Sequence, residues 1–287
     1  MKKILITGST SYIGENVVKW LANSSEVYDT DTISVRNKDW NKLDFSKYDV
    51  ILHLAGIAHV STDPRMKEKY YKVNRDLTIK LAEKAKSEGV KQFIFMSSII
   101  VYGDSSSVEK VIDLNTVPSP SNFYGDSKLQ AENGIKRLEN ESFKVVVIRP
   151  PMIYGKDSKG NYPKLAKIAR KTPVFPNIIN QRSMLHIDNL CELIRLIIVN
   201  NENGVFFPQN AKYVQVRKMI SQIAEVHGNK IWFTKAFNPF IRLLCPRVKL
   251  INKVFGNLIY DKNLSEYKQN YRVRDFKQSI SLTERGN

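Results

Sequence analysis

The stretch ITGSTSYIG, residues 6–14, decides the fold, because it joins a short apolar run to a helical stretch near the N-terminus. Dinucleotide-binding loops carry G-x-G-x-x-G at such a junction: the first glycine permits the tight turn, the second lets the backbone approach a pyrophosphate, and the third lets helix pack on strand. Gly8 and Gly14 occupy the outer positions, but Ser11 replaces the middle glycine. The position between strand and helix favours a cofactor loop, whereas the lost glycine favours an ordinary turn.

Four short apolar runs predict strands that are buried on both faces of a parallel sheet. They are KILIT, DVILHLAG, KQFIFMSS and FKVVVIRP, residues 3–7, 49–56, 91–98 and 143–150. Each run is continuously apolar rather than alternating, and helical stretches separate them. This alternation predicts an α/β fold of the Rossmann type with a doubly wound parallel sheet. We expect a dinucleotide-binding domain over 1–150 and a smaller, mainly substrate-binding portion over 151–287, from which some elements return to the first domain.

The connection after the glycine loop is short. Between Gly14 and the run at 49–56 there is room for one helix and one strand near residues 28–36. A full Rossmann half carries a further helix there. We therefore expect that helix to be missing or reduced.

A tyrosine and a lysine four residues apart suggest acid–base chemistry. Tyr124 and Lys128 lie in the helical stretch NFYGDSKLQAE and share one helix face. An ammonium group beside a phenol lowers the pKa of the phenol, which makes tyrosine a usable proton donor and acceptor near neutral pH. Ser98 ends the third apolar run, where its hydroxyl can bind the same substrate oxygen.

In this order and spacing, the glycine loop, HLAGIAHV, SSIIVYGD and the tyrosine–lysine pair resemble the extended short-chain dehydrogenase/reductase family over residues 3–190. The resemblance is strongest to its NAD-dependent nucleotide-sugar epimerases, of the UDP-galactose 4-epimerase kind. It implies that Ser98, Tyr124 and Lys128 are catalytic. The cofactor residues that it implies are Gly8, Ser11, Tyr12, Ile13, Gly14, Ser34, Arg36, Asp44, Leu54, Ala55, Gly56, Asn74, Tyr124, Lys128 and Pro151. The substrate-binding residues are Ser98, Tyr124, Asn161 and Arg182, with the guanidinium of Arg182 on the nucleotide's diphosphate and Asp44 near adenine.

The cofactor is NAD(P), and the sequence slightly favours NADP. An acidic residue about 20 positions beyond the last glycine binds the ribose 2′-hydroxyl of NAD. Counting from Gly14 leads to Ser34, followed by Arg36, and a hydroxyl near a guanidinium suits a 2′-phosphate. Asp29 and Asp31 are close enough that a different register favours NAD instead.

Three activities are compatible with this set of motifs. The first is a 4-epimerase acting on a nucleotide sugar, expected to be a UDP-hexose; the second is an NADPH-dependent reductase of 4-keto nucleotide sugars. The third is a dinucleotide-sensing regulator without turnover, which the tyrosine–lysine pair disfavours. Ile99 and Ile100 stand where family dehydratases carry an Asp-Glu pair, so elimination chemistry is disfavoured. We favour the epimerase, and the family resemblance adds polysaccharide biosynthesis and a homodimer.

Composition limits the class of partner and compartment. The net charge is +17, but no dense basic run or nucleic-acid motif appears, so an anionic small substrate is preferred over nucleic acid. The basic, apolar stretch Phe237 to Tyr260 predicts either a packed C-terminal subdomain, which we favour, or weak contact with an acidic membrane surface. Cys191 and Cys245 predict buried thiols in a reducing, cytoplasmic setting. The four histidines lack companions at ligand spacing, so we expect them to be packing or surface residues and expect no metal site.

Overall fold

The computed structural model describes residues 1–287 except 9, 58–62, 106–109, 246 and 286–287. The chain forms two compact units. Unit 1 comprises Met1–Gly103, Val117–Pro150 and Leu190–Pro208, and unit 2 comprises Asp104–Thr116, Pro151–Asn189 and Gln209–Asn287. Among the described residues, no helix is long and apolar enough to cross a membrane.

Unit 1 is built on a parallel sheet of six strands in the order β10-β6-β4-β3-β1-β2. The strands are β1 (Lys2–Thr7), β2 (Tyr28–Ile33), β3 (Val50–His53), β4 (Gln92–Met96), β6 (Lys144–Ile148) and β10 (Gly204–Phe206). β3 and β4 are buried throughout, and so are Ile4–Thr7 of β1 and Val145–Ile148 of β6, as their continuously apolar sequences predict. The predicted Rossmann-type doubly wound fold is confirmed.

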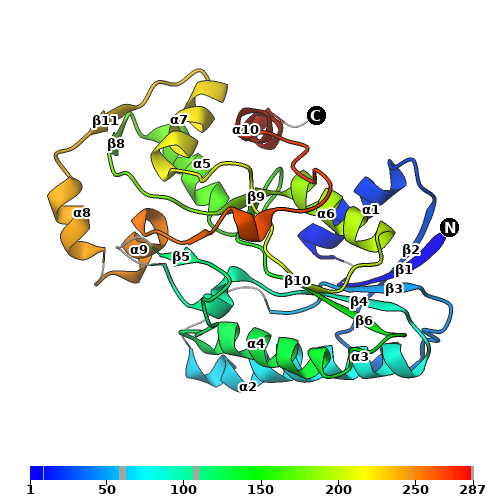
Figure 1. Ribbon diagram of the computed structural model, residues 1–287. Coiled ribbons are helices and arrows are strands. Elements are labelled where there is room, and N and C mark those ends of the chain that lie inside the picture. The colour runs from blue at the N-terminus through cyan, green and yellow to red at the C-terminus, as the bar shows by residue number, and fades with distance from the viewer. Residues whose placement is uncertain (9, 58–62, 106–109, 246, 286–287) are drawn as a thin grey trace. The chain divides into compact units, whose positions relative to one another are not determined.

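Helices cover both faces of this sheet (Figure 1). α1 (Tyr12–Ala22) and α6 (Ile187–Val199) lie on one face. The other face carries α2 (Lys67–Tyr70), a π-helical turn over Tyr71–Asp76, α3 (Leu77–Ser87) and α4 (Phe123–Lys136). Leu81, Ala85 and Ala131 pack there against Phe93 and Val145 in one hydrophobic cluster. The helices on this face hold α4 against the carboxyl end of β4.

The shortened connection after β2 is also confirmed. A single 3₁₀ turn, Lys38–Lys42, stands where a full Rossmann half has a helix, and β2 forms an edge of the sheet. Three further 3₁₀ turns occur at Pro64–Met66, Ile99–Tyr102 and Asn263–Ser265. The turn at Ile99–Tyr102 follows β4 and leads the chain away from the sheet edge.

Unit 2 consists of short parallel strand pairs and helices. The pairs are β5 (Val111–Ile112) with β12 (Ile259–Tyr260), β7 (Met152–Tyr154) with β9 (Met184–His186), and β8 (Val174–Pro176) with β11 (Trp232–Thr234). The helices are α5 (Tyr162–Lys171), α7 (Val216–Val226), α8 (Asn238–Leu244), α9 (Lys249–Phe255) and α10 (Phe276–Arg285). Leu165, Met219, Ile223 and Ile280 form the centre of its own core.

Both cysteines, Cys191 and Cys245, are buried thiols outside any disulfide, as predicted.

Candidate active site

The glycine loop turns tightly between β1 and α1, and both glycines are required by the space around them. Gly8 has φ of +90°, and a Cβ there would lie 3.2 Å from the amide nitrogen of Ala55. A Cβ on Gly14 would lie 2.8 Å from Ser11 Oγ and 3.3 Å from the Gly8 carbonyl oxygen. The predicted loop residues Gly8, Gly14, Leu54 and Ala55 are therefore in close contact at the carboxyl ends of β1 and β3.

Ser11 fits this loop without strain. Its φ of −82° and ψ of 139° are ordinary for a residue with a side chain, and Ser11 is the N-cap of α1. The hydroxyl accepts a hydrogen bond from the Gly14 amide at 3.0 Å, so it is folded back onto the helix. The N-terminal turn of α1, which contains Tyr12 and Ile13, keeps the positive end of its dipole, where a phosphate is stabilised. The loop thus fits a dinucleotide, and a cavity of about 270 Å³ adjoins Gly8 and Gly14.

Asn74 connects the loop after β3 to the helix of the tyrosine–lysine pair. It is fully buried in the π-helical turn, a local irregularity that is frequent at functional sites. Asn74 Oδ1 accepts from the Ile57 amide at 2.8 Å, and Nδ2 donates to the Ile57 carbonyl at 3.2 Å and to Ser127 Oγ at 3.1 Å. A Cβ on Gly56 would lie 3.0 Å from Asn74 Oδ1 and 3.2 Å from Lys128 Nζ.

The structure brings Ser98, Tyr124 and Lys128 together at the carboxyl end of β4. Ser98 caps the 3₁₀ turn that follows this strand, and Tyr124 and Lys128 occupy the first two turns of α4. The Ser98 hydroxyl lies near the Tyr124 hydroxyl, where it favours the phenolate form. Lys128 Nζ donates to the Met96 carbonyl oxygen at 3.0 Å. Both α4 side chains are buried, with exposed fractions of 8% for Tyr124 and 5% for Lys128.

The ionisation of this group differs from the prediction. Burial raises the pKa of Tyr124 to about 12, because its desolvation outweighs the opposing effect of the Ser98 hydroxyl. Burial also lowers the pKa of Lys128 to about 8. The expected lowering of the tyrosine pKa by Lys128 is wrong for this structure, since the ammonium group binds the Met96 carbonyl instead.

A buried ion pair supports the site from behind. Glu132 lies one turn after Lys128 on α4 and is fully buried. Arg149 Nε donates to both carboxylate oxygens of Glu132, at 3.1 and 3.2 Å, and Arg149 Nη1 donates to the Tyr102 hydroxyl at 2.6 Å. Ser97 donates to the same carboxylate. The network therefore ties α4 to the residue next to Ser98 and to the end of β6.

His53 joins β1 to α3 beneath the glycine loop. Thr78 Oγ1 donates to the Asn74 carbonyl at 2.8 Å, so it accepts from His53 Nε2 at 2.9 Å. His53 Nδ1 then accepts from the Thr7 hydroxyl at 2.6 Å. This arrangement satisfies a neutral imidazole, and burial lowers the pKa of His53 to about 3. The prediction that His53 is a packing residue is confirmed.

The edge of the sheet presents the residues proposed to select the cofactor. β2 ends at Ile33, so Ser34 is the first residue beyond its carboxyl end. Asp31 lies within the strand and accepts from the Tyr48 hydroxyl at 2.7 Å. Ser34 and Arg36 are exposed. Asp44 is exposed too, and its carboxylate accepts from the Ser46 amide at 2.9 Å.

The remaining predicted residues, Pro151, Asn161 and Arg182, belong to unit 2. Pro151 is buried just before β7, and Asn161 is exposed at the start of α5. Arg182 is half-buried, and its Nη1 donates to the Gly256 carbonyl at 3.2 Å. Burial lowers the pKa of Arg182 to about 10, so the guanidinium stays charged at neutral pH.

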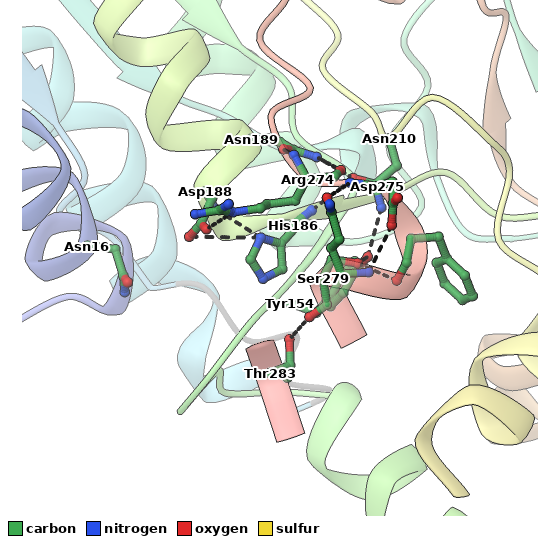
Figure 2. A network of polar contacts seen from close by, with 12 residues as sticks. Asn16, Tyr154, His186, Asp188, Asn189, Asn210, Arg274, Asp275, Ser279 and Thr283 are labelled. Carbon is green, nitrogen blue, oxygen red and sulfur yellow. Dashed lines mark hydrogen bonds and ion pairs between the residues drawn. The ribbon is translucent and has the colours of Figure 1, made fainter. Parts of the chain in front are cut away.

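The stretch NQRSMLHIDNL, residues 180–190, contains Arg182 and also contributes His186, Asp188 and Asn189 to a polar network in unit 2 (Figure 2). Arg274 Nε donates to Asp188 at 2.8 Å, and Asn189 donates to the Arg274 carbonyl at 3.1 Å. The network also holds His186 beside Asp188, and Asn210 reaches Tyr154 and, beyond it, Ser279 of α10. Burial lowers the pKa of His186 to about 4. His186 is thus a structural residue, as predicted.

The other two histidines have different outcomes. His227 lies at the surface, where it pairs with Glu284 at 2.6 Å, as predicted. His59 and the end of HLAGIAHV lie outside the described residues. In the part of the chain that the structure describes, no group of three or more His, Cys, Asp or Glu side chains could hold a metal ion.

Sequence reasoning missed the supporting residues: Thr7, Thr78, Ser97, Tyr102, Ser127, Glu132 and Arg149. One signal was present, because Glu132 follows Lys128 by one helical turn and Arg149 ends an apolar run. A buried carboxylate and a buried guanidinium are stable only as an ion pair, because a buried charge without a partner is strongly destabilising. The threonine contacts of His53 carry no comparable sequence pattern.

The chain is similar to known nucleotide-sugar enzymes. A model of the NAD dependent epimerase/dehydratase family matches residues 4–207. The chain is 31% identical over 278 residues to a UDP-glucose 4-epimerase of Vibrio cholerae, which covers 89% of this chain and 83% of that protein.

Solved structures show the same fold at lower identity. A UDP-glucuronic acid 4-epimerase from Bacillus cereus in complex with NAD is similar at a TM-score of 0.75 and 19% identity, over 99% of this chain and 98% of that one. A dTDP-4-dehydrorhamnose reductase from Clostridium acetobutylicum reaches 0.73 at 19% identity, over 97% of each chain. The chain therefore belongs to the NAD-dependent epimerase/dehydratase family and is an enzyme of the extended short-chain dehydrogenase/reductase type.

Proposed function

We propose that this enzyme is a nucleotide-sugar 4-epimerase that acts on a UDP-hexose. The observation that carries the proposal is that half-buried Ser98 lies together with buried Tyr124 and Lys128, a group that can exchange a proton with a single sugar hydroxyl. The Vibrio cholerae relative is named a UDP-glucose 4-epimerase and aligns with 89% of this chain, which supports the choice of reaction and nucleotide.

Each of the three side chains has a distinct role in this proposal. Tyr124 takes the proton of the C4 hydroxyl when the sugar is oxidised and returns it when the sugar is reduced. Ser98, which lies near Tyr124, orients the same oxygen. When bound, the NAD(P) nicotinamide accepts hydride from C4 and gives it back. The sugar must present its other face between the two transfers, so the product is an isomer of the substrate.

Lys128 supplies positive charge in this site at neutral pH. With a pKa of about 8 it is mainly protonated at pH 7, whereas Tyr124, with a pKa of about 12, is a neutral phenol. The phenol is therefore ready to donate a proton toward a developing C4 oxyanion. In the opposite direction, Tyr124 must start as the phenolate, which takes the proton of the C4 hydroxyl and becomes the phenol. Because the pKa of about 12 makes the phenolate scarce at neutral pH, the positive charge of a bound oxidised nicotinamide would have to lower that pKa.

Replacing Tyr124 with Phe tests the assignment of the proton carrier. General acid–base catalysis contributes about 10²- to 10⁴-fold, so Tyr124→Phe is expected to reduce turnover by about that factor. Dinucleotide binding, measured by fluorescence titration, is expected to stay within about threefold of the unaltered protein, because the glycine loop is intact. Full activity in Tyr124→Phe contradicts the proposal.

The alternative activity is a 4-keto nucleotide-sugar reductase, and one observation favours it. Ser34 follows the last residue of β2, with Arg36 exposed beside it, and such a pair suits the 2′-phosphate of NADPH. Incubation with UDP-hexoses and with their 4-keto forms, in the presence of NADH or NADPH and analysed by mass, separates the two. An epimerase yields an isomer of unchanged mass, and a reductase yields a product with two more hydrogens.

We also propose that the enzyme uses NADP in preference to NAD. Arg36→Ala is then expected to weaken NADPH binding by about tenfold while NADH binding changes little, since a charge-assisted hydrogen bond contributes about 1.5–3 kcal/mol. The control is Lys47→Ala, because Lys47 is an exposed cation that pairs with Asp31. This variant should bind the two cofactors with the same preference as the unaltered protein. Equal losses for the two cofactors in Arg36→Ala contradict the preference.

The proposed setting is a cytoplasmic homodimer. The two buried thiols are compatible with a reducing compartment. The family resemblance supports a dimer, which sedimentation of the purified protein would test.

A further inference from the structure

The segment Val226–Tyr260 carries positive charge without any negative charge. It contains six Lys or Arg residues and no Asp or Glu, within a chain that has 28 acidic residues. Lys230, Lys235 and Arg247 are exposed. Lys230 Nζ also lies over the ring of Trp232, 5.5 Å from its centroid. This segment therefore presents cations beside an aromatic side chain.

The same segment exposes large apolar side chains. Trp232 and Phe240 are each 67% exposed, Leu243 is 58% exposed and Phe237 is 52% exposed. Phe237 is the N-cap of α8, and Phe240 and Leu243 follow it at intervals of three residues. Their side chains therefore fall within an arc of about 120° around the helix axis, on one face of the helix. We refer to Trp232, Phe237, Phe240 and Leu243 as the apolar patch.

This exposure is not a sign that the segment lacks a core. Phe233, Val254 and Phe255 pack against the hydrophobic core of unit 2, and Phe175 contacts the rings of both Phe233 and Phe255. Cys245, at the end of α8, is buried. The predicted packed subdomain is thus present on the inner side of the segment. Its outer side carries the apolar patch.

We propose that the apolar patch and the surrounding cations bind the enzyme to an anionic membrane surface. Aromatic and aliphatic side chains of an exposed helix enter the headgroup region, and each Lys or Arg near an anionic leaflet adds about 1 kcal/mol. A second copy of the chain fits less well, because a symmetric contact places like charges against each other. Nucleic acid would use the cations but leave the apolar face of α8 without a partner.

Vesicle binding with Trp232 as the reporter tests this proposal. The chain has three tryptophans; Trp40 is buried, and Trp20 donates a hydrogen bond to Glu192, whereas Trp232 is exposed. Vesicles with about 30 mol % phosphatidylglycerol are expected to shift its emission to shorter wavelength and to bind about tenfold more protein than neutral phosphatidylcholine vesicles. High salt is expected to reduce this binding.

Two matched double variants make the test specific. Phe240→Ser/Leu243→Ser is expected to weaken vesicle binding by about tenfold or more, because two exposed apolar side chains that would enter the headgroup region are lost. Leu114→Ser/Val117→Ser removes side chains that are 86% and 79% exposed outside this segment and is expected to change nothing. Both variants should keep the activity of the parent protein on a soluble nucleotide sugar, which shows that they are folded.

Three results would overturn the proposal. One is the absence of binding to the anionic vesicles; another is an equal loss of binding in the two double variants. The third is loss of self-association, or of binding to a single-stranded oligonucleotide, in Phe240→Ser/Leu243→Ser without any effect on vesicles. Such a result would assign the patch to a second copy or to nucleic acid.

Discussion

The buried ion pair behind the active site and an exposed ion pair of unit 2 use charge in opposite ways. Glu132 is fully buried against Arg149 in unit 1, and their hydrogen bonds extend to Ser97 and Tyr102. In unit 2, Glu266 remains 61% exposed beside Arg272. The buried pair needs all of its partners in place, whereas the exposed pair can exchange its partner for water. Charge positions the site in the first case and adds little to the fold in the second.

The largest expected effect comes from removing one member of the buried pair. Glu132→Ala leaves Arg149 buried without its carboxylate, which is expected to lower the free energy of unfolding by about 3–5 kcal/mol. Glu266→Ala is the control in unit 2 and is expected to cost less than about 1 kcal/mol. Urea denaturation of both variants measures the difference. Similar losses in the two variants would remove the contrast between the two pairs.

The two units each contain a buried neutral histidine, His53 in unit 1 and His186 in unit 2. The stability of the protein at acidic pH tests this similarity. The folded pKa values of His53 and His186, about 3 and about 4, lie below the ordinary value of 6.5. The unfolded chain then binds more protons, so stability is complete above pH 6.5 and is lost as the pH falls toward those folded values. We expect each histidine to cost about 2 kcal/mol between pH 7 and pH 5.

Proton NMR of the imidazole rings measures this directly. The signals of His53 and His186 are expected to stay at their neutral positions from pH 8 to about pH 5 while the protein is folded. A midpoint near 6.5 for either ring contradicts the buried neutral state.

A smaller effect is expected at the glycine loop. Gly14→Ala places a Cβ 2.8 Å from Ser11 Oγ and 3.3 Å from the Gly8 carbonyl, so the loop must shift. We expect dinucleotide affinity to fall by about tenfold, equivalent to about 1.4 kcal/mol. Ser11→Gly/Gly14→Ala removes the hydroxyl from this clash and should recover part of the loss. If adding Ser11→Gly recovers none of the lost dinucleotide affinity, the contact between the new Cβ and Ser11 Oγ is not the cause of the loss.

The sequence predicted the elements that have local signatures. Continuous apolar runs predicted the central strands, and the short span before Val50 predicted the reduced connection after β2. The tyrosine–lysine spacing placed both side chains on one face of α4. These features depend on residues that are near one another in the chain.

The features that the sequence did not reveal depend on tertiary packing. Burial reverses the predicted shift of the Tyr124 pKa, and no spacing rule reports how deeply a phenol is buried. Asn74 clamps Ile57 and Ser127, and their positions in the sequence lie 17 and 53 residues away. Likewise, the sequence of the segment Val226–Tyr260 does not tell which of its aromatic side chains are buried. In the structure, Phe255 packs against the core of unit 2, whereas Phe240 is exposed.

The central claim is that one site removes hydride from C4 and returns it to the same carbon. Incubation of the enzyme with a UDP-hexose that carries deuterium at C4, followed by mass spectrometry and NMR of the product, tests this directly. The account predicts a C4 epimer of unchanged mass with the deuterium still at C4. A product that has lost water, or a substrate that is left unchanged while the corresponding 4-keto sugar gains two hydrogens, would contradict it.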